Sequence, residues 1–187
     1  PMTYVSSTAV HTDLASVEPN SVNNRMLRVM VRMSSAGAPV ALTQFALNTN
    51  GGGNDTANIA NAKIYYTGNS PVFATTTLFG SYSVVSPTSA TWPSYNINGN
   101  QLLGNDTNYF WLTYDLKAGA VLLDSVDAEV TGLTIATVSQ TPTVTAPAGR
   151  RIIRGAYCIS NATSTFDGEI LNVTIDNFSN TTTCTTN

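Results

Sequence analysis

The chain of 187 residues is long enough to bury one sizeable core with a small appendage. Charged residues make up only 10% of it, against about 25% in an ordinary soluble domain, and Thr, Ser and Asn supply the polar surface, a balance that suits an extracellular β-protein. The net charge of −3, with basic residues gathered only at Arg150, Arg151 and Arg154, argues against nucleic-acid binding, and no apolar run approaches the roughly 18–20 residues of a membrane helix.

Alternation of apolar and polar residues recurs along the chain, whereas helical periodicity is almost absent. In the segment 25–33, one face carries Leu27, Val29, Val31 and Met33. The next segment, 38–47, changes phase part-way, which predicts a β-bulge near Thr43-Gln44. Further strands are predicted, between stretches rich in turn-forming residues, at 59–67, 72–79, 95–97, 109–116, 126–137 and 151–156.

The stretch from Leu103 to Tyr109 leads into one of these strands and resembles the tyrosine corner of Greek-key sandwiches, in which a Tyr hydroxyl bonds back to the backbone. Turn signals recur at roughly the 8–12-residue spacing of sandwiches and barrels. We therefore predict an all-β protein: an Ig-like, Greek-key β-sandwich over residues 1–155, followed by an extra C-terminal strand segment over 156–187.

Several short motifs resemble one known family, the N-terminal domain of BNR-repeat neuraminidases. The two longest are Ala62-Lys-Ile-Tyr-Tyr-Thr-Gly68 and Asn108-Tyr-Phe-Trp-Leu-Thr-Tyr-Asp115, and the others lie at 4–8, 21–24, 42–45, 79–80, 127–129 and 141–147. The resemblance implies a β-sandwich that precedes the catalytic domain of secreted or surface-attached proteins, mainly in Bacteroidota-type bacteria. Such a module is an accessory and carries no chemistry of its own.

The C-terminal segment resembles the opening of a GEVED-type surface module, through Tyr157-Cys158 and the stretch 167–180. It stops after about thirty residues, too few to bury a core alone. The strand expected at 169–176 has one apolar face, made of Leu171, Val173 and Ile175, and needs a sheet to join, either in its own sandwich or in that of a neighbour. Cys158 and Cys184 are expected to form a disulfide in an oxidising compartment, with two unpaired thiols as the alternative.

Catalytic groups are not evident in the sequence. The repeated Ser-x-Asp-x-Gly-x-Thr-Trp box of sialidases is absent, and Arg150, Arg151 and Arg154 lack the Tyr nucleophile and acidic partner that sialidase chemistry needs, so we expect no enzyme activity. The single histidine, His11, lies in a polar segment and is expected to be exposed to solvent. We expect no cofactor and no zinc site; binding of Ca²⁺ by the loop 50–55, where Asp55 is the one carboxylate, stays open.

The sequence contains a candidate residue for contact with a sugar and several candidate residues for glycosylation. Trp92, beside Pro93 in a loop, is the candidate for stacking on a sugar ring, whereas Trp111 lies mid-strand and is expected to pack in the core. Six Asn-x-Ser/Thr sequons occur, at a frequency expected by chance, and two sites resemble the O-glycosylation signal of Bacteroidota. The candidate glycosylated residues are Asn54, Asn105, Asn161, Asn172, Asn177, Asn180, Thr56 and Ser125.

Two functional hypotheses follow. In the first, the chain is a secreted, glycosylated structural subunit that assembles with identical copies into a surface fibre by donating a strand, 169–176 or 3–10, to a neighbouring sheet. In the second, it is an accessory, carbohydrate-binding or adhesion module of a larger sialidase-like protein. The length of the native gene separates them, because a stop codon soon after Asn187 favours the fibre subunit.

Overall fold

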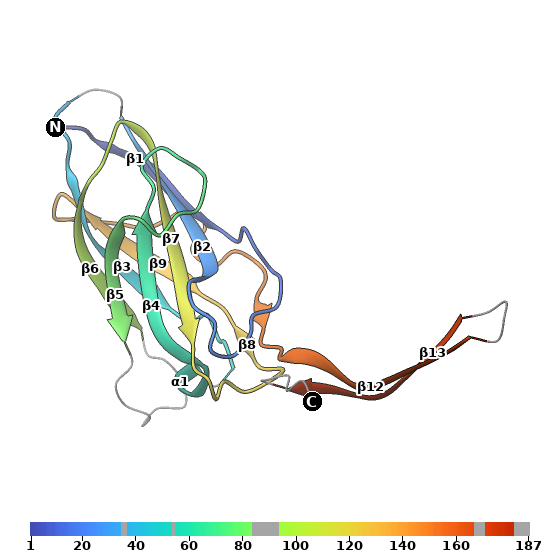
Figure 1. Ribbon diagram of the computed structural model, residues 1–187. Helices are drawn as coiled ribbons and strands as arrows, with labels where there is room; N and C mark the ends of the chain where they lie inside the picture. Colours follow the sequence, from blue (N-terminus) through green and yellow to red (C-terminus); the bar gives the residue numbers. More distant parts are fainter. Residues whose placement is uncertain (35–36, 54, 84–93, 167–170, 182–187) are drawn as a thin grey trace.

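The computed structural model describes residues 1–34, 37–53, 55–83, 94–166 and 171–181, and from Ala156 onward it describes the backbone only. The main body is a β-sandwich of two antiparallel sheets (Figure 1). One sheet has the order β1-β2-β7-β4-β5 and the other the order β10-β9-β3-β6. The prediction of an all-β sandwich is therefore confirmed.

The strands of the first sheet are β1 (Tyr4–Val10), β2 (Asn24–Met33), β7 (Asp106–Leu116), β4 (Ile59–Tyr66) and β5 (Leu78–Ser83). Those of the second are β10 (Val138–Gln140), β9 (Glu129–Ile135), β3 (Ala41–Asn48) and β6 (Tyr95–Leu102). A single turn of helix, α1 (Asp55–Asn58), precedes β4, and two short strands, β8 (Ser125–Val126) and β11 (Arg151–Ile152), pair beside the sandwich.

The core lies between the two sheets because each strand turns its apolar face inward. Leu27, Val29, Val31 and Met33 of β2 are all buried, as their alternation predicts. At the centre the ring of Phe45 in β3 meets those of Phe79 in β5 and Phe110 in β7 edge-on, with centroids 5.3 and 5.2 Å apart. The aromatic residues thus join the two sheets across the core.

The expected bulge in β3 is present. The pairing of β3 shifts register between Leu42 and Gln44 against both of its neighbours, β6 and β9. The extra residue turns Phe45 and Leu47 into the core, where both are fully buried. A change in sequence phase here corresponds directly to a change in backbone geometry.

Several predicted strands have the wrong bounds. The strand expected at 95–97 continues to Leu102, the one expected at 109–116 begins at Asp106, and the one expected at 151–156 ends at Ile152. The strand expected at 72–79 begins only at Leu78, because the preceding residues form a loop whose Phe73 ring packs against Tyr65 and Trp111. The strand expected at 126–137 ends at Ile135, because Ala136 and Thr137 take φ angles of 47° and 68° and turn the chain into β10. Positive φ at both positions is characteristic of a tight hairpin turn.

The corner before β7 is closed by Asn108, next to the tyrosine expected in that role. The amide of Asn108 accepts a hydrogen bond from the backbone N–H of Gly104 and donates one to the Gly104 carbonyl, both at 2.8 Å. It also accepts one from the Tyr66 hydroxyl, at 2.8 Å. Tyr109 instead faces outward, where Arg28 lies over its ring.

Beyond residue 155 the chain forms a hairpin that projects from the sandwich (Figure 1). Its strands, β12 (Ala156–Phe166) and β13 (Leu171–Thr181), pair antiparallel in a sheet of their own. The expected lone strand with Leu171, Val173 and Ile175 is thus one half of a hairpin, because the residues after Gly155, including Cys158, already supply its partner. Cys184 lies outside the described residues, so the disulfide stays a prediction.

Candidate functional site

The outer face of the five-stranded sheet carries an unusual row of side chains. The register places Val10, Arg28, Trp111 and Tyr65 opposite one another on β1, β2, β7 and β4. In the adjacent row Met30 of β2 lies opposite Tyr109 of β7. These outward positions alternate with the core positions of the same strands. We call Arg28, Met30, Phe73, Tyr109 and Trp111 the Arg28 surface.

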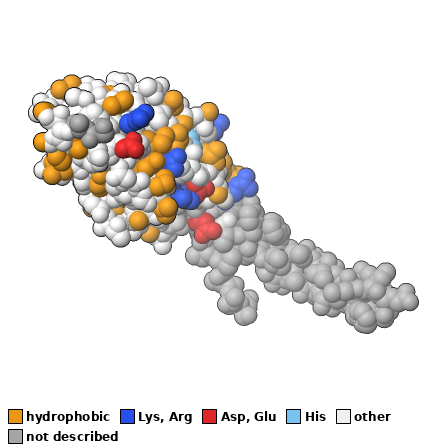
Figure 2. Space-filling view, turned by 90° about the horizontal axis from the view of Figure 1, so that it is seen from above, with side chains coloured by type: hydrophobic (Ala, Val, Ile, Leu, Met, Phe, Trp, Pro, Cys, Tyr) orange, Lys and Arg blue, Asp and Glu red, His pale blue; other side chains and the backbone are white. Residues whose placement is uncertain are grey.

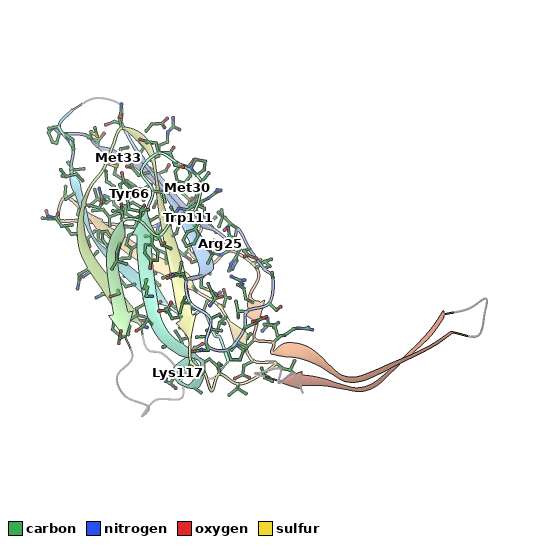
Figure 3. All side chains as sticks on the ribbon, in the orientation of Figure 1. Arg25, Met30, Met33, Tyr66, Trp111 and Lys117 are labelled. Atoms are coloured by element: carbon green, nitrogen blue, oxygen red, sulfur yellow. The ribbon has the colours of Figure 1, made fainter. Side chains whose placement is uncertain are left out.

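Cationic and aromatic groups are stacked on this surface. The guanidinium carbon of Arg28 lies 5.6 Å from the ring centroid of Tyr109 and 5.7 Å from that of Trp111. Phe73 packs against Trp111, at 5.5 Å between centroids, and Arg25 lies over Phe73 at 5.8 Å. Both distances to Arg28 are within the range of cation–π attraction. Figure 3 shows Met30, Trp111 and Arg25 following one another along this face.

Trp111 is buried, as expected for a mid-strand tryptophan, but outside the sandwich core. Only 2% of it is exposed, and its indole Nε1–H donates a hydrogen bond of 2.9 Å to Thr67 Oγ1. The covering residues come from the loop before β5 and from β2. That an arginine covers Trp111 was not predicted from the sequence, although Arg28, Met30 and Arg32 occupy the outward positions of a clearly alternating strand.

Most cations on this face are compensated by carboxylates. Arg25 Nη2 lies 2.9 Å from Asp13, Lys63 Nζ lies 2.5 Å from Asp115, and Arg32 Nε lies 3.8 Å from the exposed Asp106. Arg28 has no such carboxylate within the described part of the chain, and its Nε–H is buried without a hydrogen-bond acceptor. Figure 2 shows basic side chains set among hydrophobic ones on the face it presents.

The ion pairs lower the pKa values of two of these carboxylates. Burial acts to raise the pKa of Asp115, but hydrogen bonds from Lys63, the Asn23 backbone and Asn61 outweigh it. Burial likewise opposes the lowering of the pKa at Asp13, where the Ala15 backbone, Arg25 and the charge of Arg151 outweigh it. Both carboxylates are therefore ionised at neutral pH and neutralise their partners.

A second polar region lies at the end of the sandwich near α1. Two open hollows, of about 380 and 370 Å³, adjoin the turn at Asn50-Gly51. Asp55 is 1% exposed and accepts a 2.6 Å hydrogen bond from the Thr49 hydroxyl, while its other oxygen, Oδ1, has no hydrogen-bond partner among the described residues. Burial, opposed by the Thr49 bond and reinforced by the charges of Asp124 and Asp127, raises the pKa of Asp55 to about 6.

His11 belongs to this region, and the expectation that it is exposed is wrong. Its side chain is only 4% exposed, with Nδ1 2.9 Å from the Met26 carbonyl and Nε2 3.3 Å from Asp127. Arg151, from a distant part of the chain, holds the segment after β1 in place by donating a 2.7 Å hydrogen bond to the Ala15 carbonyl. No signal local to His11 predicts that contact.

This region was also searched for metal ligands. Within the described ranges, no group of three His, Cys, Asp or Glu side chains is placed to hold a metal ion. The loop 50–55, for which Ca²⁺ binding is an open question, contributes Asp55, which begins α1, while Asn54 lies outside the described residues. Nor does any described helix have the length and apolar character needed to cross a membrane.

The predicted glycan positions fall in different surroundings. Asn105 is exposed in the turn before β7, which suits a glycan, whereas Thr56 is only 7% exposed in α1, so its side chain is not available for O-glycosylation. Ser125 is half-buried in β8. Trp92 and Asn54 lie outside the described residues, and Asn161, Asn172, Asn177 and Asn180 lie on the hairpin strands.

Comparison with known proteins identifies the family of the chain. The model of the N-terminal domain of BNR-repeat neuraminidase matches residues 6–138. The chain belongs to this family. The matched domain is the N-terminal one and not the catalytic one, and it spans most of the sandwich described above.

A solved structure shares the fold of this neuraminidase-type domain. The Hadza microbial sialidase Hz136 superposes with a TM-score of 0.57 at 14% sequence identity, covering 81% of this chain and 34% of that sialidase. The chain therefore spans about a third of the length of the sialidase it matches. Among curated proteins, no relative matches the chain. None of these matches points to a fibre-forming subunit, and that hypothesis stays a prediction.

Proposed function

We propose that the chain is the non-catalytic accessory β-sandwich of a secreted, sialidase-like surface protein, in which it holds the larger protein on glycans. The family match over residues 6–138 carries this proposal, because the matched domain is the one that accompanies a neuraminidase catalytic domain. The low content of charged residues suits an extracellular location.

The surroundings of Arg151 support the non-catalytic role. Arg151 is 5% exposed, and its guanidinium is occupied by the carbonyls of Ala15 and Arg25, at 2.7 and 2.9 Å. It holds the segment after β1 in place and is not open to a substrate carboxylate. The side chains of the His11–Asp127 pair are also largely buried, at 4% and 9% exposed.

The test combines an assay with the genetic context. The chain is incubated with a fluorogenic sialoside, and release of the fluorophore is followed against buffer alone. We expect no release, together with a native gene that continues into a catalytic domain bearing the repeated Ser-x-Asp-x-Gly-x-Thr-Trp box. Turnover by the chain itself would overturn the non-catalytic role, and a gene that ends soon after Asn187 would overturn the accessory role.

A self-assembling fibre subunit is the second candidate, and the projecting hairpin favours it. In the described structure β12 and β13 pair only with each other, so their outer edges offer backbone groups to a further strand. Electron microscopy and the mass in solution test this candidate. Regular filaments that are lost on deletion of 169–187 would support it, whereas a monomer before and after deletion would exclude it.

A further inference from the structure

The turn at Asn50-Gly51, which follows β3, has the chemistry of a spontaneous modification site. We propose that Asn50 converts to aspartate and isoaspartate through attack of the Gly51 backbone nitrogen on the Asn50 side chain, and that the new carboxylate faces Asp127. The inference goes beyond the glycan-holding role and does not depend on it.

The reaction needs only water. The Gly51 nitrogen loses its proton to solvent hydroxide and bonds to Cγ of Asn50, while the side-chain nitrogen takes a proton from water and leaves as ammonia. A water molecule then opens the resulting cyclic imide at either of its carbonyls, which gives aspartate or isoaspartate. A glycine in the second position favours the attack, because no Cβ crowds its nitrogen and its backbone rotates freely.

The structure leaves this turn open to the reaction. Both residues are exposed, with φ angles of 47° for Asn50 and 70° for Gly51, and a Cβ added to Gly51 would meet no described atom within 4 Å. No described group accepts a hydrogen bond from the Gly51 N–H. The turn itself is closed by one bond of 3.0 Å, from the Gly52 N–H to the Thr49 carbonyl. Little structure therefore has to open before the nitrogen reaches the side chain.

The sequence contains one further Asn-Gly pair, Asn98-Gly99, and the fold protects it. Asn98 lies within β6 opposite Gln44 of β3, whose side-chain amide donates a 2.9 Å hydrogen bond to Asn98 Oδ1. Gly99 packs so closely on β5 that an added Cβ would lie 2.5 Å from the Phe79 carbonyl oxygen. The strand must separate from its neighbours before this pair can react, and that opening costs free energy.

The position of Asn50 gives its conversion a physical effect. Asn50 Nδ2 donates a 2.9 Å hydrogen bond to Asp127 Oδ2, while Asp127 Oδ1 accepts one of 2.7 Å from the Ala128 N–H. A carboxylate at position 50 has no hydrogen to donate and adds a second negative charge, although Arg150, which lines the same hollow, reduces the repulsion in part. Asp127 is joined to the core, since its carbonyl accepts a 3.1 Å hydrogen bond from the buried Tyr114 hydroxyl. The conversion therefore weakens the end of the sandwich near α1.

The experiment incubates the full chain at mildly alkaline pH and follows both pairs by mass spectrometry of tryptic peptides. Trypsin cleaves after Lys and Arg, which places Asn50 in the peptide 33–63 and Asn98 in the peptide 64–117. Fragmentation assigns the converted residue, and an isoaspartyl methyltransferase labels the isoaspartate. We expect Asn50 to convert at least about tenfold faster than Asn98, the factor that an opening cost of about 1.4 kcal/mol produces.

The same incubation in urea is the control for the role of the fold. Both pairs should then convert at similar rates, because only the shared Asn-Gly sequence remains. Equal rates in the folded chain, no conversion of Asn50, or the same preference for Asn50 in urea would overturn the inference.

Variants at positions 50 and 127 test the effect of the conversion. Asn50→Asp reproduces the aspartate product and should lower the melting temperature by about 2–4 °C, as expected for the loss of one hydrogen bond. In the Asp127→Asn background the same change should cost nothing, because the new amide can donate to the new carboxylate. Asn50→Gly suits the positive φ, lacks the reacting side chain and should abolish conversion at this turn. An unchanged melting temperature of Asn50→Asp, or an equal loss in both backgrounds, would overturn the proposed contact with Asp127.

Discussion

Replacement of Asp55 by Asn should remove a pH dependence from the stability of the sandwich. Asp55 has a pKa of about 6 in the folded protein against its ordinary value of 3.8. At 1.36 kcal/mol per unit, this difference corresponds to a cost of about 3 kcal/mol when the buried carboxyl ionises. The folded state therefore binds a proton between pH 3.8 and about 6 that the unfolded state does not bind, and stability from this group falls as the pH rises through that window.

The size of this effect follows from comparing the free energy of unfolding at two pH values, about 4.5 and about 7.5. At the lower pH most of the benefit of the protonated carboxyl is present, and at the higher pH it is lost, a change of about 2 kcal/mol in the free energy of unfolding. The amide that replaces the carboxyl in the Asp55→Asn variant does not titrate, so the stability difference between wild type and variant should change by this amount. Contributions of titrating groups remote from Asp55 cancel in the difference.

Urea unfolding at these two pH values, followed by tryptophan fluorescence, measures this change. Asp106→Asn is the matched control, because the side chain of Asp106 is 74% exposed and its removal should leave the pH dependence unaltered. If Asp55→Asn and the wild type lose stability in parallel, within about 0.5 kcal/mol, the reasoning about the buried carboxyl is refuted.

Three further variants test other parts of the fold by the same urea unfolding. Asn108→Ala should cost about 3 kcal/mol, because it leaves the partly buried N–H and carbonyl of Gly104 without their partner; a loss below about 1 kcal/mol would contradict that role. Ala136→Asn with Thr137→Gly should add about 1–2 kcal/mol, since both positions have positive φ, and unchanged stability would argue against the turn. Arg151→Lys should cost about 1–3 kcal/mol, because a lysine cannot bind the two carbonyls with a fixed fork, and a neutral effect would show that the fork is dispensable.

The strands and the bulge could be predicted because their signal is local. The inward residues of β2 and the phase change in β3 are set by alternation along a few residues, and every strand must turn one face to the core. The family resemblance likewise rests on motifs within single strands. Local patterns thus establish the fold class without any knowledge of distant contacts.

The errors arise where distant residues decide the outcome. His11 is buried because its ring contacts the Met26 carbonyl and Asp127, both of which are distant in sequence. The loop around Phe73 reads as a strand by its composition, but its ring is needed against Trp111. The turn at Ala136-Thr137 contains neither Asn nor Gly, so its positive φ angles leave no mark in the sequence.

The strand order of the five-stranded sheet also bears on the time course of folding. β7 lies between β2 and β4, so both earlier strands leave the ribosome well before their common neighbour is made. Until then the edge of each strand that will pair with β7 has no partner, and an unpaired strand edge can pair with another chain. The arrival of β7 is therefore the event that commits a newly made chain to its own sandwich instead of to aggregation.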